Sequence, residues 1–223
     1  MWHFDGDVRG AVRLLCSSEQ GVQPDTHSYG LMQKKHPTRP PDRRKPPTVL
    51  ALPPLVTSED VLRAIKSFPL GSSGGIDGLR PQHLLDLLDK VVSSTLAETM
   101  LDFVNLVLSG GVPLSIRSIF FGGRLFSLSK PGGGLRPIAI GMTLRRLVAK
   151  IANRVAVNKC SHYLTPRQLG VGVKGGCEAV VHAARAFLIS CPAGSALLKI
   201  DFNNAFNTLR RDSMLEAVQR HIP

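Results

Sequence analysis

Apolar residues recur at helical spacing through most of residues 57–220. Val61, Ile65 and Phe68 fall on one face of a helix that Thr57 would cap, with Asp60 placed to assist the N-terminal dipole. The same reasoning predicts further helices over residues 81–91, 95–108, 142–160, 177–188 and 212–221. The pattern therefore predicts a mostly helical region that starts near Thr57.

Two parts of this region have the pattern of β-strands instead. Residues 124–130 and 135–140 flank a Pro-Gly-Gly-Gly turn and predict a β-hairpin. Residues 196–201 form a short apolar run that predicts a strand buried on both faces, with Asp201 at its end. Residues 71–78 are rich in glycine and serine and predict a flexible loop. The expected fold class is α/β (α+β), with more helix than strand.

The first 56 residues have a different composition. An apolar pattern predicts a helical segment over residues 1–18. Residues 19–56 are expected to form a disordered linker, because the prolines between positions 37 and 47 exclude a helix. This linker would contact phosphates, act as a nuclear address or serve as a solvated spacer. Its basic residues include Lys34, Lys35, Arg43, Arg44 and Lys45.

The charge balance favours a polyanionic partner. The chain has 28 Lys and Arg against 16 Asp and Glu, a formal net charge of +12, which points to nucleic acid ahead of an anionic membrane surface. The apolar run 96–108 carries Glu98 and Asp102, so no transmembrane span is expected. The N-terminus lacks the apolar core of a signal peptide. We therefore expect an intracellular protein without a membrane partner.

Four short motifs occur in order between positions 57 and 220. They are Gly74-Gly-Ile-Asp-Gly-Leu-Arg-Pro81, Leu128-Ser-Lys-Pro-Gly-Gly-Gly-Leu-Arg-Pro-Ile138, Gln168-Leu-Gly-Val-Gly172 and Asp201-Phe-Asn-Asn-Ala-Phe206. Together they resemble the reverse transcriptases of non-LTR retrotransposons. Val171 stands where this family usually has phenylalanine, and Asn207 where it often has aspartate. Each motif alone is weak evidence, but four in the family's order are specific.

The resemblance implies part of a right-hand polymerase: mostly helical fingers with a β-hairpin, followed by the first strand of the palm. Residues 57–223 would form this partial domain. Such enzymes are RNA-directed DNA polymerases, or nucleotidyltransferases. They add deoxynucleoside triphosphates to the 3′-hydroxyl of a DNA primer on an RNA template, with Mg²⁺. A retrotransposon protein of this kind is expected in the nucleus and the cytoplasm.

The resemblance also implies roles for particular residues. Lys130 and Arg136 would bind the triphosphate. Asp201 would be the catalytic carboxylate and hold Mg²⁺, with the backbone carbonyl of Phe202 as a further ligand. Phe206 would pack where a ribose 2′-hydroxyl would lie and so favour deoxynucleotides. The basic linker, Arg145 and Arg146 would contact the bound template, or the two arginines would lie on a solvated face of their helix.

Each of these residues also has a structural interpretation. Lys130 and Arg136 would be surface charges, Asp201 would cap the segment that follows, and Phe206 would be a core aromatic. The family's second carboxylate motif does not follow Asp201 here, and two-metal chemistry needs it. We therefore expect this chain, taken alone, to be an inactive fragment of such an enzyme. The alternative is a non-catalytic, basic nucleic-acid-binding remnant of a retrotransposon.

Overall fold

The computed structural model describes residues 21–36, 55–88, 93–130 and 132–221, with residues 15–17 and the single positions 8, 12 and 53. The chain divides into two compact units: Met1–Pro37 with Leu52–Ala152, and Thr38–Ala51 with Asn153–Pro223. The partial domain expected over residues 57–223 therefore contributes to both units. Most of the helical segment predicted over residues 1–18 lies outside the described residues, as do Arg43, Arg44 and Lys45.

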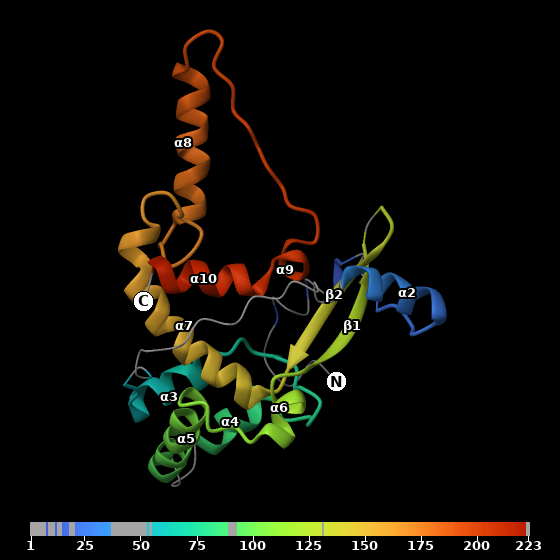
Figure 1. Ribbon diagram of the computed structural model, residues 1–223, viewed down its shortest axis with the longest axis vertical. Coiled ribbons are helices and arrows are strands. Elements are labelled where there is room, and N and C mark those ends of the chain that lie inside the picture. Colours follow the sequence, from blue (N-terminus) through green and yellow to red (C-terminus); the bar gives the residue numbers. More distant parts are fainter. Residues whose placement is uncertain are drawn as a thin grey trace. The chain divides into compact units, whose positions relative to one another are not determined.

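The described elements are helices with one antiparallel two-stranded sheet (Figure 1). The first unit contains α2 (Thr26–Lys35), α3 (Ser58–Lys66), α4 (Pro81–Leu88), α5 (Ser93–Leu108), α6 (Leu114–Phe120), β1 (Gly123–Ser129), β2 (Leu135–Gly141) and the start of α7 (Thr143–Leu164). The second contains the rest of α7, α8 (Gly176–Ser190), α9 (Ala205–Thr208) and α10 (Arg211–His221). This mixture of helices and a small sheet agrees with the expected α+β class.

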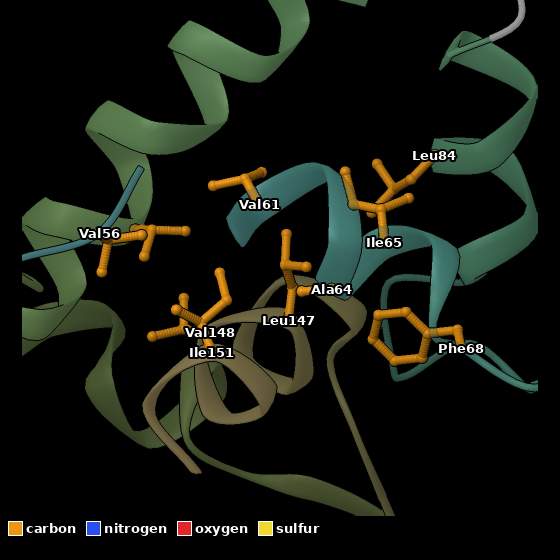
Figure 2. Packing of buried hydrophobic residues seen from close by; sticks show 10 residues of the cluster. Val56, Val61, Ala64, Ile65, Phe68, Leu84, Leu147, Val148 and Ile151 are labelled. Atoms are coloured by element: carbon orange, nitrogen blue, oxygen red, sulfur yellow. The ribbon is translucent and has the colours of Figure 1, made fainter. Parts of the chain in front are cut away.

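The core of the first unit lies between α3, α4, α5 and α7. Figure 2 shows Val61, Ala64 and Ile65 of α3 packed against the side chains of α7. Leu147, Val148 and Ile151 supply the α7 side of this cluster, and all three are buried. Burial of these aliphatic side chains is the main stabilising term available to the unit. It fixes the first turns of α7 beside α3.

The predicted start of α3 is confirmed. The Thr57 hydroxyl accepts a hydrogen bond from the Asp60 N–H at 3.2 Å, and the Asp60 carboxylate accepts one from the Thr57 N–H at 3.2 Å. This reciprocal capping box satisfies two backbone donors that the helix leaves without partners. The next helix, α4, begins at Pro81 as the sequence predicts, because a first-turn proline gives up no helical hydrogen bond.

The predicted hairpin is also confirmed. β1 pairs antiparallel with β2, from Gly123 opposite Gly141 to Ser129 opposite Leu135. At the turn, the Lys130 N–H donates to the Gly134 carbonyl at 3.1 Å, and the Gly133 N–H donates to the Lys130 carbonyl at 3.0 Å. The three turn glycines have φ values of +88°, +94° and +88°, a left-handed conformation that glycine adopts without strain.

Helix α2 lies in the segment that was expected to be a disordered linker. Residues 26–35 contain no proline, and the prolines that exclude a helix begin at position 37. Asp25 caps the helix: its carboxylate accepts the Ser28 N–H at 2.6 Å, while the Ser28 hydroxyl accepts the Asp25 N–H at 2.9 Å. The expectation of disorder was therefore wrong for these ten residues. The short helices α6 and α9 were not predicted either.

The strand predicted over residues 196–201 is absent. These described residues form no regular element, and Leu197, Leu198 and Ile200 are exposed rather than buried. An apolar run fits a strand, but a strand exists only through ladder hydrogen bonds to a neighbour. No described segment pairs with this run, so the backbone is left outside any sheet.

The glycine-rich loop of residues 71–78 is held more closely than expected. A Cβ added at Gly75 would lie 2.6 Å from the Cα of Met142, directly before α7. The buried Thr143 hydroxyl donates to the Leu79 carbonyl, which ties the loop to the first residue of the helix. The glycines are therefore needed for close backbone approach. Within the described part of the chain, no helix is both long enough and apolar enough to span a membrane.

Candidate nucleic-acid interface

The β1–β2 hairpin places the two predicted triphosphate-binding residues on one face. Arg136 of β2 lies directly opposite Leu128 of β1, and Lys130 follows Leu128 by two residues. Because side chains alternate between the faces of a strand, Leu128 and Arg136 point to the same side. Lys130 directly follows β1, and its N–H donates to the Gly134 carbonyl, so the same alternation places it on that side. Lys130 and Arg136 are both exposed. The hairpin therefore presents two cations that an external anion can reach.

The same face extends toward the other end of β1. Arg124 and Phe126 lie at alternate positions with Leu128, so they share its face. The Arg124 guanidinium carbon lies 4.8 Å from the centroid of the Phe126 ring, a cation–π contact. The face thus combines three cationic side chains with an aromatic ring. Such a combination is typical of surfaces that bind single-stranded nucleic acid.

The residues of the fourth motif lie in the second unit, and all except the half-buried Asn204 are exposed. Phe206 is 94% exposed, so the interpretation of it as a core aromatic is wrong. Phe202 is 75% exposed. Asn204, not Asp201, occupies the N-cap position of the short helix α9, with a left-handed φ of 55° and without a side-chain capping hydrogen bond. Asp201 is therefore neither in a strand nor a helix cap, and its carboxylate is open to solvent.

The residues around Asp201 do not by themselves form a metal site. Mg²⁺ prefers several oxygen ligands, usually more than one carboxylate. Over residues 21–36, 55–88, 93–130 and 132–221, no group of three or more His, Cys, Asp or Glu side chains gathers. Asp201 and the carbonyl of Phe202 would supply only part of such a set.

The two lysines predicted to contact nucleic acid at the start of the basic segment lie at the end of α2. Lys34 and Lys35 occupy the last turn of this helix, where positive charge interacts favourably with the helix dipole. Lys34 is exposed and Lys35 is half-buried. Their position is explained by helix stability, and the exposed Lys34 also remains open to an anion.

The two arginines predicted to contact template differ in their surroundings. Arg146 donates from Nη1 to the Ser73 carbonyl at 2.6 Å, and its guanidinium carbon lies 5.3 Å from the centroid of the Phe68 ring. Burial lowers the pKa of Arg146, and the neighbouring charge of Arg145 lowers it further. Arg145 has a buried Nε without a hydrogen-bond partner among the described residues. Arg146 therefore ties α7 to the glycine-rich loop, whereas Arg145 does not.

Sequence reasoning did not find the contact between this loop and α7. Lys150 makes a separate contact with the end of α3: its Nζ donates to the Ser67 carbonyl at 3.3 Å and lies 4.8 Å from the Phe68 ring centroid. The residues involved are more than 70 positions apart in sequence. The one available signal was the adjacent glycine pair Gly74-Gly75, which is typical of close backbone approach.

Comparison with known proteins supports the origin that the motifs indicate. Over 167 residues, or 73% of its length, the chain is 27% identical to the retrotransposable element SLACS 132 kDa protein of Trypanosoma brucei gambiense. The chain is similar to a retrotransposon protein. It spans 13% of the length of that relative. No family model and no solved structure matches the chain. The similarity indicates a retrotransposon origin.

Proposed function

We propose that this chain is part of a non-LTR retrotransposon reverse transcriptase and that its hairpin binds the phosphates of nucleotide or nucleic acid. The observation that carries the proposal is the hairpin face on which Lys130 and Arg136, both from the second of the four ordered motifs, lie exposed together with Arg124. The distant retrotransposon relative and the net charge of +12 support it.

The chemistry of nucleotide addition explains why such a face is needed. A triphosphate concentrates negative charge, and transfer of its α-phosphoryl group increases the charge on the leaving oxygens. Lys130 offers a mobile point charge, while Arg136 offers a planar fork of donors that fits phosphate oxygens. The exposed Phe206 would contact the sugar of the nucleotide, and Asp201 would contribute one carboxylate to a magnesium site completed elsewhere in the enzyme.

The test is RNA binding measured by fluorescence anisotropy over a range of salt concentrations. The double variant Lys130→Gln with Arg136→Gln should bind a single-stranded RNA more weakly. The slope of the logarithm of its association constant against the logarithm of salt concentration should be shallower by about 1.4. Each lost contact to a phosphate of a single strand reduces this slope by roughly 0.7.

The matched control removes the same charge elsewhere. Lys66→Gln with Arg154→Gln replaces two exposed cations outside the hairpin. This control should keep the wild-type slope. Equal slopes for the hairpin variant and the wild type would refute phosphate binding by the hairpin.

A second candidate function is binding without catalysis, as in a nucleic-acid-binding remnant. It is favoured by the absence of a potential metal cluster among the described residues and by the exposure of Asp201. Primer extension with Mg²⁺ or Mn²⁺ by this chain tests the binding-only role. Incorporation that disappears in Asp201→Ala would assign catalysis to this chain and exclude the binding-only role.

A further inference from the structure

A hollow of about 310 Å³ opens in the first unit, where β2 ends and α7 begins. Two guanidinium groups, a loop serine and the backbone at the end of β2 surround it. Its lining residues are Ser73, Ala139, Ile140, Gly141, Arg145 and Arg146. No acidic residue lines the hollow. The side chains around the hollow therefore carry positive charge only, which suits the binding of an anion.

Arg145, which lines this hollow, has an unsatisfied donor. Its Nε is buried and has no hydrogen-bond partner among the residues that the structure describes. A buried donor of a charged group is costly to leave without an acceptor. The guanidinium lies against Gly141: a Cβ added there would be 1.7 Å from Nη2 of Arg145. The missing side chain at position 141 is what leaves room for this arginine.

The second guanidinium is already fixed. Arg146 is held by the Ser73 carbonyl and by the Phe68 ring, so it keeps its place without a ligand. Its pKa is lowered by burial and then by the charge of Arg145, so the two like charges repel each other across a partly desolvated space.

The helix adds to the same positive field. Arg145 and Arg146 lie in the first turn of α7, which contains no acidic residue. The N-terminus of a helix carries partial positive charge, so two cations at this end are unfavourable and an anion there is favourable. An anion in the hollow would pair with Arg145 and offset the repulsion between the arginines.

We propose that this hollow binds a phosphate group, with Arg145 and Arg146 as its ligands. Phosphate oxygens match the fork of guanidinium donors, and a bidentate pair would satisfy the orphaned Nε. The choice of phosphate among oxyanions rests on the proposed function. The phosphate would come from the backbone of a nucleic-acid strand or from a free nucleotide.

The first test is calorimetric titration of the full chain with pyrophosphate, at ionic strength held constant with chloride. Arg145→Gln should weaken binding about tenfold, the effect of losing one charge-assisted hydrogen bond. Gly141→Ala should weaken pyrophosphate binding as well, because the new Cβ displaces the guanidinium of Arg145 from its place in the hollow. Only the end of a flexible side chain has to move, so the fold should stay intact. Arg154→Gln, a matched change at an exposed arginine of the same helix, should stay within about twofold of the wild type.

Circular dichroism of each variant separates loss of binding from loss of fold. Gly141→Ala retains every charge, so weaker binding in this variant cannot be attributed to net charge. The proposal would be overturned if the wild type did not bind pyrophosphate. It would also be overturned if Arg145→Gln and Gly141→Ala were both folded and both bound pyrophosphate with wild-type affinity.

The second test identifies the source of the phosphate. Arg145→Gln is compared with the wild type for affinity to a deoxynucleoside triphosphate and to a short single-stranded RNA. A loss confined to the triphosphate assigns a free nucleotide, a loss confined to RNA assigns a backbone phosphate, and a loss in neither overturns the site. The hairpin variant Lys130→Gln with Arg136→Gln keeps the two proposals distinguishable, because it leaves the hollow unchanged and should still bind pyrophosphate.

Discussion

Leu147→Ala tests the packing that fixes the start of α7. Leu147 is 0% exposed and belongs to the cluster formed with Val61, Ala64 and Ile65 of α3 (Figure 2). The substitution removes three carbon atoms, worth roughly 0.8 kcal/mol each in transfer free energy, or about 2.4 kcal/mol. The cavity that remains raises the expected loss in free energy of unfolding to about 3–5 kcal/mol.

The assay is urea denaturation followed by circular dichroism at 222 nm, with the free energy of unfolding extrapolated to water. The matched control is Leu114→Ala, because Leu114 is 80% exposed at the start of α6. It should change the free energy of unfolding by less than about 0.5 kcal/mol. A loss below about 1 kcal/mol for Leu147→Ala, or equal losses for both variants, would refute the packing of α7 against α3.

Three further substitutions test local features. Thr57→Ala removes the cap of α3 and should cost about 1 kcal/mol of unfolding free energy in the same denaturation assay, whereas Thr57→Ser should cost little. Thr143→Val leaves the Leu79 carbonyl without its donor and should cost about 1–3 kcal/mol, and no loss would contradict that hydrogen bond. The backbone N–H and hydroxyl of Ser28 hold the pKa of Asp25 below its ordinary value of 3.8. The stabilisation of α2 is thus present above that pH and is lost as pH falls through the lower folded pKa, which NMR titration of the Ser28 amide measures. Asp25→Asn should cap without titrating, and an unchanged pH profile in this variant would refute the assignment.

The elements that sequence predicted correctly depend on local signals. A threonine three residues before an aspartate begins α3, and a glycine turn between two apolar runs forms the hairpin. The common face of Lys130 and Arg136 was also predictable, because a hairpin of fixed register determines which side chains share a face. These outcomes need no information about distant parts of the chain.

The elements that sequence predicted wrongly depend on distant partners. The apolar run 196–201 has strand composition, but the composition does not specify the neighbour with which it pairs. The hollow beside Arg145 was not predictable, because it forms only where Ser73 and Gly141 meet the start of α7. The linker prediction failed at α2 because the clustered prolines exclude a helix only where they occur, from position 37 onward. Residues 26–35 contain no proline and form a helix.

The glycines of this chain would respond differently to engineering. The turn glycines of the hairpin, at positions 132–134, have positive φ and open space around them, so asparagine or a D-amino acid could replace one at modest cost. Gly74 and Gly75 face backbone atoms at 2.7 Å and 2.6 Å from an added Cβ, so alanine and any larger L-residue would collide there. A library that varies the turn can keep the fold, whereas one that varies the loop must keep both glycines.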